Sequence, residues 1–174
     1  MITIRLANPN DVSLITDMGR SSFIQAFAHL NDPVHFQAHL DRYHTYETIE
    51  DEFKIQKNQF YIAEYFTKPA GFCKLVLDED EKHPELANYS CLELERIYVL
   101  KPYQGLHIGY HLFNKAEEVG CQTKFEILWL GVWEKNLKAI EIYKKWGFSE
   151  FGSHTFDLGG DIQTDLMMKK YLTL

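Results

Sequence analysis

An almost unbroken apolar run spans residues 125–133, with the sequence Phe-Glu-Ile-Leu-Trp-Leu-Gly-Val-Trp. Such a run is typical of a strand in the middle of a sheet, because a strand covered on both faces needs apolar side chains at nearly every position. Helical patterns precede and follow it, over residues 108–119 and 136–148. We therefore expect an α/β protein in which helices cover a central sheet.

The first third of the chain is expected to be helical after a single strand. Residues 2–6 alternate between apolar and polar side chains, which predicts a short strand. The segment 8–11 supplies turn and capping residues for a first helix, and Asp32 followed by Pro33 marks the start of a second. A third, shorter helix is expected over residues 48–53.

The pattern then changes to short β-rich runs, over residues 60–64 and 70–77. We expect these two runs to form a hairpin that turns at Lys68-Pro69. An acidic stretch follows, Asp78-Glu79-Asp80-Glu81. Two interpretations of this stretch stay open: a solvated loop between strands, or a collar of charge that attracts a polycation.

Residues 91–100 contain two carboxylates within a predicted strand. Strict alternation places Glu93, Glu95 and Ile97 on one face of this strand and Tyr98 nearer the other. Two carboxylates on one face of a strand are unusual. This face is therefore a candidate functional site.

A loop with two glycines joins this strand to the next helix. Pro102 ends the strand, and residues 103–109, Tyr-Gln-Gly-Leu-His-Ile-Gly, lead into the helix. Its apolar stripe consists of Ile108, Leu112, Ala116 and Val119. Free backbone N–H groups and the helix dipole make such a helix start an anion site. Many loops of this kind carry two glycines for steric reasons, so the spacing alone is a weak sign of phosphate binding.

The last third predicts one more helix and two strands. Asn136 can cap the helix and Gly147 can end it. The residues that share one face of this helix are Asn136, Ala139, Ile140 and Tyr143. Strands near residues 148–157 and 162–170 are joined by the turn Gly159-Gly160-Asp161.

Charge and cysteine content exclude several classes of protein. The chain has 25 Asp and Glu against 18 Lys and Arg, a net charge of -7, which repels a phosphate backbone and offers no basic stripe for nucleic acid. Cys73, Cys91 and Cys121 are widely spaced and lack a Cys-x-x-Cys pair, so neither a disulfide framework nor a zinc site is expected. No segment resembles a signal peptide or a membrane span. We expect a single cytoplasmic domain, residues 1–174, with neutral or cationic partners and neither nucleic acid nor a membrane among them.

Three sets of residues resemble the GNAT superfamily of N-acetyltransferases, which transfer an acetyl group from acetyl-CoA to an amine. The opening strand and helix cap of that family are similar to Ile4-Arg5-x-Ala7-x-x-x-Asp11. Its pyrophosphate loop, Q/R-x-x-G-x-G/A, is similar to Gln104-x-x-His107-x-Gly109. Its last conserved helix is similar to Asn136-x-x-Ala139-x-x-x-Tyr143-x-x-x-Gly147-Phe148, the most specific of the three. Together these motifs span nearly the whole chain.

The resemblance implies the GNAT acyltransferase fold, a mixed and mostly antiparallel seven-stranded sheet flanked by helices. It also implies acetyl-CoA as cosubstrate, no metal, and direct transfer to a primary amine. Residues 92–99, 129–136 and 163–166 resemble more narrowly the bacterial spermidine/spermine N-acetyltransferases of the Pai type. This closer resemblance favours a small cationic amine, spermidine or spermine, as the acceptor.

The fold by itself does not identify the acceptor, because related acetyltransferases change it by altering loops and the early helices. Two other hypotheses therefore stay open. One is the same chemistry on another amine, such as a protein N-terminus or an aminoglycoside-like antibiotic. The other is a non-catalytic acyl-CoA-binding regulatory module. A homodimer also stays open.

The resemblance assigns a set of contacts to acetyl-CoA. The pantetheine arm is expected to pair with the strand at 97–99, the backbone of residues 104–109 to bind the pyrophosphate, and Asn136 to bond the pantetheine amide or to cap its helix. The full set comprises Ile97, Tyr98, Val99, Gln104, Gly105, Leu106, His107, Ile108, Gly109, Tyr110, Asn136, Ala139, Tyr143 and Lys145. His107 stands where the family has glycine, and its Cβ is compatible with this role if φ stays negative. Its side chain could contact a phosphate or lie partly exposed in the helix's first turn.

Transfer requires a neutral amine and a proton for the departing CoA thiolate. A polyamine nitrogen has a pKa of roughly 10 and is mostly protonated at pH 7. The resemblance assigns Glu95 as the proton acceptor, with Glu93 as the second candidate, and either could act directly, through a water or by holding charge. The structural alternative for Glu95 is an ion pair with Arg96 or Lys74. The resemblance also assigns Tyr143 as the proton donor to the thiolate, and the alternative is a tyrosine that only packs in the core.

Other patterns predict less. Two pairs of histidines have the i, i+4 spacing of helical metal ligands: His35 with His39, and His107 with His111. Neither pair has an obvious third ligand, so solvated helical histidines are expected. None of the cysteines has the local context of a covalent acyl-enzyme nucleophile. Phe23, Phe27 and Phe36 either wall an aliphatic polyamine or pack in the core.

Overall fold

The computed structural model describes residues 1–77 and 83–173. In these residues a seven-stranded sheet has the order β1-β2-β3-β4-β5-β7-β6. Its strands are β1 (Ile2–Leu6), β2 (Asn58–Tyr65), β3 (Lys68–Leu77), β4 (Cys91–Val99), β5 (Ile127–Trp133), β6 (Ser149–Leu158) and β7 (Asp161–Tyr171). The helices are α1 (Val12–Phe27), α2 (Pro33–Tyr43), α3 (Tyr46–Lys54), α4 (Ile108–Gln122) and α5 (Leu137–Lys145).

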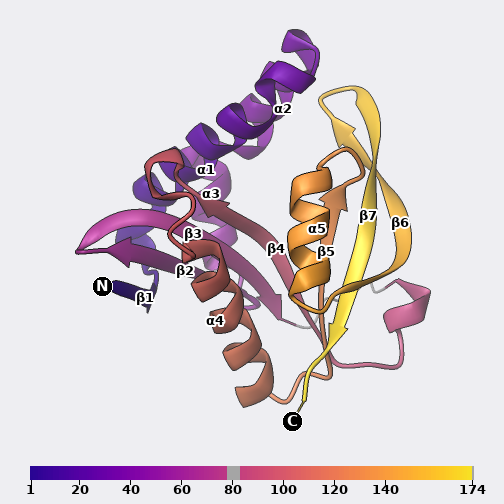
Figure 1. Cartoon of the computed structure of the whole chain (residues 1–174). Helices are drawn as coiled ribbons and strands as arrows, with labels where there is room; N and C mark the ends of the chain where they lie inside the picture. Colours follow the sequence, from indigo (N-terminus) through magenta and orange to yellow (C-terminus); the bar gives the residue numbers. More distant parts are fainter. Residues whose placement is uncertain (78–82, 174) are drawn as a thin grey trace.

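Helices cover both faces of this sheet (Figure 1). Helices α4 and α5 lie on one face, and α1, α2 and α3 lie on the other. Neighbouring strands run antiparallel except for β4 and β5, which are parallel. The mixed, mostly antiparallel seven-stranded sheet flanked by helices is thus confirmed. None of the helices described is long and apolar enough to cross a membrane.

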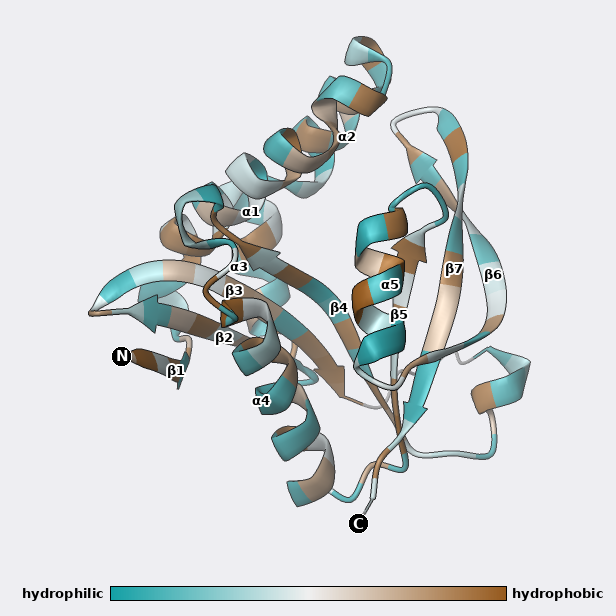
Figure 2. Ribbon diagram, in the orientation of Figure 1, coloured by the Kyte–Doolittle hydropathy of each residue, from teal (hydrophilic) through white to brown (hydrophobic). Residues whose placement is uncertain are grey.

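Apolar side chains pack on both faces of the sheet. The largest cluster lies under α4 and α5 and includes the expected stripe of α4, in which Ile108, Leu112, Ala116 and Val119 are all buried. A second cluster joins α1 and α3 to β2 and β3. Figure 2 shows the same division, with brown along the central strands and teal on the outward side of α4.

Local capping signals fix most helix ends as expected. The Asp32 carboxylate accepts hydrogen bonds from the N–H groups of Val34 and His35, at 2.9 and 3.3 Å, and starts α2 at Pro33. Gly147 follows the end of α5 with a φ of +92°, a conformation that glycine adopts without steric cost. Helix α3 begins at Tyr46, earlier than expected, because the Thr45 side chain caps it.

The turn of the β2–β3 hairpin differs from the prediction. Phe66 and Thr67 form it, with φ values of +46° and +68°, whereas Lys68 and Pro69 already belong to β3. A two-residue hairpin of this type needs positive φ at both central positions. A proline ring holds φ near −65°, so Pro69 is excluded from the turn itself.

A β-bulge on β4 overturns the strict alternation predicted for this strand. Lys74 on β3 pairs with Arg96, whereas Leu75 pairs with Leu94, so Glu95 is an extra residue in the register. Ile97 therefore packs on the same face as Leu94, under α4, and not with the carboxylates. Strict alternation fails because an inserted residue reverses the face of every residue that follows.

The C-terminal hairpin follows its prediction. Strands β6 and β7 pair along their length, and Gly159 and Gly160 turn between them with φ values of +62° and +103°. The acidic stretch 78–81 lies outside the described residues, so both interpretations of it stay predictions.

Candidate active site

The sheet opens between its two parallel strands. Strands β4 and β5 pair only at their first residues, and the pairing ends at Glu93 and Trp129, although the strands continue to Val99 and Trp133. Beyond this point the two strands diverge (Figure 1). Backbone N–H and C=O groups along the diverging edges have no partner strand between them, so an extended ligand can pair with them.

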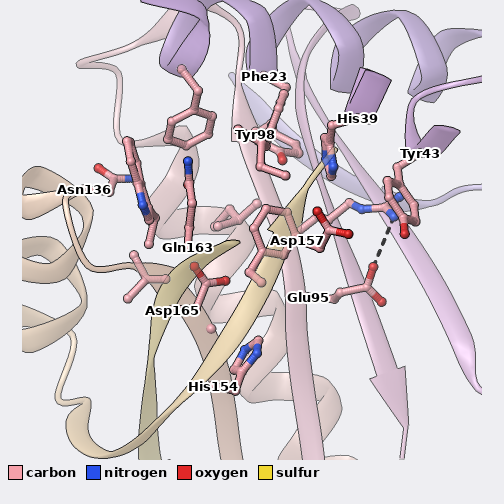
Figure 3. A pocket seen from close by; sticks show the side chains of 18 of the residues that line it. Phe23, His39, Tyr43, Glu95, Tyr98, Asn136, His154, Asp157, Gln163 and Asp165 are labelled. Atoms are coloured by element: carbon pink, nitrogen blue, oxygen red, sulfur yellow. Dashed lines mark ion pairs between the residues drawn. The ribbon is translucent and has the colours of Figure 1, made fainter. Parts of the chain in front are cut away.

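A cavity of about 520 Å³ lies at this opening. Residues from α1, α2, β4, β5, α5, β6 and β7 line it, and Figure 3 shows side chains from several of these elements converging. Its aromatic lining comes from Phe23, Phe27, Tyr43, Tyr98, Trp133, Tyr143 and Phe156. Phe36 is not part of the lining, because it stacks behind Phe23 with the ring centroids 5.2 Å apart.

Negative charge outweighs positive charge in the lining. Four carboxylates line the cavity: Glu93, Glu95, Asp157 and Asp165. Arg96 is the single Lys or Arg among the described residues of the lining. A cavity with this balance and aromatic walls favours a cationic ligand with an apolar body.

Glu95 is held between two cations. Its carboxylate lies 2.6 Å from Lys74 Nζ and 3.2 Å from an Arg96 nitrogen, the ion pair drawn as a dashed line in Figure 3. Glu52 binds the other side of this group, with two hydrogen bonds from Arg96, of 2.7 and 2.9 Å, and an ion pair to Lys74. The structural alternative for Glu95 is therefore present. Arg96 is paired with two carboxylates, those of Glu52 and Glu95, which disfavours it as a binder of an acidic substrate.

Glu93 occupies a different position from Glu95. It lies at the last β4–β5 pair, is buried, and lines the cavity. Both carboxylates line the cavity, but only Glu95 lies in the bulge.

Tyr143 lies on the face of α5 that borders the cavity. Its ring packs edge-on against Trp146 and Phe148, with centroids 5.7 and 5.9 Å apart. Burial, together with the nearby Tyr98 phenol, raises the pKa of Tyr143, so its hydroxyl keeps its proton at neutral pH. Packing and proton donation are therefore compatible in this residue.

Asn136 also borders the cavity and caps α5. Its side-chain oxygen accepts a hydrogen bond of 3.3 Å from the N–H of Ala139. The cap uses the oxygen of the amide and leaves its nitrogen to donate. Lys145, by contrast, is exposed at the end of α5 and is not part of the lining.

The glycine-containing loop before α4 has an unexpected backbone conformation. His107 is the N-cap of α4 and has a φ of +60°, so the condition of a negative φ at this position is not met. Gly105 also has a positive φ, +83°. His107 thus has the left-handed backbone conformation that glycine favours, although it carries a Cβ. Because the first N–H groups of a helix have no partner within it, the start of α4 can bind an anion.

The sequence did not predict that two histidines are buried. His39 and His44 are 5% and 6% exposed, so the solvated histidine expected at position 39 is wrong. Burial lowers the pKa of His39 to about 4 and that of His44 to about 3, with Arg96 adding to the effect, so both are neutral at pH 7. His39 follows Phe36 by three residues on the apolar stripe of α2, a spacing that could have signalled its burial.

Polar residues of the C-terminal hairpin were also missed as site residues. His154, Asp157, Gln163 and Asp165 line the cavity. Gln163 and Asp165 lie in the segment 163–166 that resembles the Pai-type enzymes, but this resemblance did not identify them as site residues. Sheet pairing brings all four residues to the cavity.

The described residues contain neither a metal-binding cluster nor an activated thiol in the cavity. No group of three or more His, Cys, Asp or Glu among them is arranged to hold a metal ion. Burial raises the pKa of the Cys73 thiol to about 12, which keeps it protonated and unreactive.

The open sheet, the helix start beside it and the cavity define an acyltransferase that acts with a coenzyme A thioester. A model of the acetyltransferase (GNAT) family matches residues 24–148, and the chain belongs to this family. It is an N-acetyltransferase, and acetyl-CoA is its cosubstrate.

The chain is similar in sequence to one N-acetyltransferase and in structure to two others. An uncharacterised N-acetyltransferase of Lactobacillus delbrueckii subsp. lactis is 33% identical over 171 residues, which cover 98% of each chain. The PaiA N-acetyltransferase of Thermoplasma acidophilum, solved in complex with coenzyme A, has the same fold, with a TM-score of 0.80 at 19% identity over 98% of this chain and 99% of that one. The ribosomal-protein-alanine N-acetyltransferase of Brucella melitensis has a TM-score of 0.70 at 20% identity, over 98% and 99% of the two chains. An enzyme named for a protein acceptor thus shares this fold, and the fold by itself does not identify the acceptor.

Proposed function

We propose that the enzyme transfers an acetyl group directly from acetyl-CoA to a primary amine of a small polycation, spermidine or spermine. The observation that carries this proposal is the cavity at the open end of β4 and β5, which has four carboxylates and aromatic walls. The carboxylates favour protonated amines, and the aromatic rings favour the methylene chain between them.

In this proposal acetyl-CoA binds on the face of the sheet that α4 and α5 cover. The pantetheine arm pairs with β4 at residues 97–99, and the N–H groups of residues 104–109 bind the pyrophosphate. The free edge of β4 and the start of α4 support these roles. Asn136 donates to a pantetheine carbonyl through its amide nitrogen, while Ala139 and Lys145 border the arm and the phosphates.

Tyr143 is the proposed proton donor to the departing thiolate. Its raised pKa supports a hydroxyl that is protonated at pH 7, and its place in the lining supports contact with the sulfur. Glu95 and Glu93 are the proposed acidic groups for the amine. The two cations around Glu95 favour a role in shaping and charging the cavity over a role as the base.

The test is incubation of the protein with acetyl-CoA and a panel of amines, with thiol release and product mass read together. Spermidine and spermine should give monoacetylated products with a lower KM than a neutral amine of the same length. An aminoglycoside and an alanine-terminated peptide serve as rival acceptors. Turnover of a rival alone would replace the polyamine proposal. Tight CoA binding without turnover of any amine would favour a regulatory module.

Three broader hypotheses accompany this one. We infer a single N-acetyltransferase domain over residues 1–174, supported by a sheet that includes strands from both ends of the chain. The cytoplasmic location and the homodimer stay predictions.

A further inference from the structure

Two polar side chains face each other across the C-terminal hairpin. His154 on β6 and Asp165 on β7 are directly paired residues of antiparallel strands, and such pairs project from the same face of a sheet. Asp165 also pairs with Trp133 on β5, which places the two side chains on the face opposite α5. Both residues line the cavity, and Figure 3 shows them adjacent beneath Gln163.

A glycine on β5 lets both side chains of this pair lie close to the strand. A Cβ built on Gly131 would lie 3.3 Å from His154 Nε2 and 3.6 Å from Asp165 Oδ2. Both polar atoms thus lie beside Gly131, which also lines the cavity at the opening between β4 and β5. An amino group that enters the cavity next to Gly131 can contact the carboxylate and the imidazole together.

The hydrogen bonding of His154 leaves its inward nitrogen free to accept a proton. Its Nδ1 lies 3.1 Å from the carbonyl oxygen of Thr155. A carbonyl oxygen only accepts, so Nδ1 carries the hydrogen and Nε2 of the neutral ring has a lone pair. That lone pair belongs to the nitrogen nearest Gly131. The His154 residue as a whole is exposed, so a proton taken up there can leave to solvent.

Asp165 is a carboxylate without a donor. In the described part of the chain no group donates a hydrogen bond to it and no Lys or Arg forms an ion pair with it. Burial raises the pKa of Asp165, and the positive charge of a protonated His154 opposes this shift. A half-buried carboxylate of this kind is stabilised by a cation entering the cavity.

We propose that His154 accepts the proton of the acceptor amine and that Asp165 binds its ammonium group, an inference that rests on the proposed function. Asp165 binds the ammonium group, and His154 Nε2 takes one proton from it. The neutral nitrogen then forms a bond to the acetyl carbon while the bond from that carbon to sulfur breaks. The sulfur leaves with the proton of the Tyr143 hydroxyl, and the second proton lost by the nitrogen restores that hydroxyl. The proton on His154 passes to solvent.

Other charged groups of the cavity differ from this pair. Glu93 on β4 and Asp157 on β6 add negative charge to the lining, and the neutral His39 on α2 adds none. Glu95 already has two cationic partners. Among the described residues of the lining, His154 and Asp165 thus place a proton-accepting nitrogen next to a carboxylate that has no cationic partner. Both groups lie beside Gly131.

The experiment measures kcat/KM for spermidine from pH 6 to 10 in the wild type, His154→Gln and Asp165→Asn. His154→Gln should lower kcat/KM at pH 7 about 100-fold, the usual contribution of a general base. The loss should shrink as pH rises, because the free amine becomes abundant near its own pKa of roughly 10. Asp165→Asn should raise KM for spermidine about tenfold or more. His111→Gln, which changes an exposed histidine of α4, should match the wild type.

A second readout does not depend on turnover. In protein labelled with nitrogen-15 at histidine, spermidine added without acetyl-CoA should shift the His154 Nε2 resonance in the wild type and not in Asp165→Asn. CoA titration by calorimetry shows that each variant is folded. An unchanged pH profile in His154→Gln, or no shift of the resonance in the wild type, would overturn the pair. Absence of turnover by the wild type with every amine would instead remove the proposed function.

Discussion

The ammonium of Lys74 lies 2.6 Å from the carboxylate of Glu95, and both residues belong to the bulge at which β4 loses its alternation. The Lys74 side chain is 5% exposed, and the Glu95 side chain is 29% exposed. An ammonium this deeply buried needs a carboxylate partner. Glu95 is thus fixed in position by the same contact that makes it a poor candidate for the base.

Replacing Glu95 with glutamine should therefore affect stability more than the pH dependence of the reaction. The free energy of unfolding should fall by about 1–3 kcal/mol, because Lys74 loses one of its two carboxylates. KM for spermidine should rise, whereas the pH profile of kcat/KM should keep its shape. Urea denaturation and steady-state kinetics measure these effects.

Glu118→Gln is the matched control for this change. Glu118 pairs with Lys115 at 2.8 Å on the surface of α4, where its side chain is half exposed. Its removal should cost less than about 1 kcal/mol, as is usual for surface ion pairs. A pH profile that moves upward in Glu95→Gln would identify Glu95 as the base and would count against His154.

Tyr143→Phe tests the proton donor. The variant keeps the ring that packs on Trp146 and Phe148, so folding and CoA binding should be unchanged. Loss of the hydroxyl should lower kcat by about 100-fold or more, because the thiolate must leave without a proton. Calorimetry measures CoA binding, and single-turnover kinetics measure the rate of the chemical step. Tyr171→Phe, at an exposed position, is the control, and an unchanged kcat in Tyr143→Phe would remove the assignment.

His107→Gly tests the shape of the loop before α4. A left-handed conformation costs a non-glycine residue about 1–2 kcal/mol, and the larger entropy of glycine in the unfolded chain offsets part of this. The variant should thus be more stable by about 0.5–1 kcal/mol, measured by thermal and urea unfolding. His107→Ala keeps the Cβ and should show no gain. CoA affinity should be the same in His107→Gly as in the wild type if backbone N–H groups bind the pyrophosphate, and a large loss would show that the imidazole contributes.

Stability should fall in mild acid because of His39 and His44. Their pKa values in the folded protein, about 4 and about 3, lie below the ordinary value of 6.5, so the unfolded chain takes up protons first as pH falls. Stability is therefore intact above pH 7 and declines below 6.5, by about 1.4 kcal/mol per pH unit for each histidine, until the folded pKa is reached. Urea denaturation between pH 4.5 and 8 measures this slope.

His39→Phe isolates one of the two histidines. In the described residues the buried Nδ1 of His39 has no hydrogen-bond partner, so phenylalanine removes the titration without removing a known bond. The slope below pH 6.5 should decrease by about 1.4 kcal/mol per pH unit relative to the wild type. Equal slopes in the two proteins would show that His39 is not buried in its neutral form.

Features set by neighbouring residues could be predicted from the sequence. The caps at Asp32 and Asn136, the glycine that follows α5 and the buried stripe of α4 depend on hydrogen bonds and spacings within a few residues. The motif around Tyr143 depends on the same helical spacing. For this reason the helices, most of the strands and the family could be predicted correctly.

Long-range pairing decided the rest. The bulge at Glu95 depends on the register between β3 and β4, and it moved Ile97 to the other face of the strand. His39 is buried because α2 packs beside the cavity, where its neighbours are Phe23 and Phe156. The hairpin turn lies at Phe66 and Thr67, two residues before its predicted position. The strand register and the fixed φ of proline together exclude Pro69 from the turn.

The sequence by itself determined which helices and strands form and which fold they build, because those preferences arise from local hydrogen bonds and hydrophobic spacing. Only the tertiary structure decided which polar groups meet in the cavity. Glu95 gained Lys74 as a partner, and His154 gained Asp165, through pairing between strands. Such pairing depends on how the whole sheet is assembled, and no short stretch of sequence specifies it.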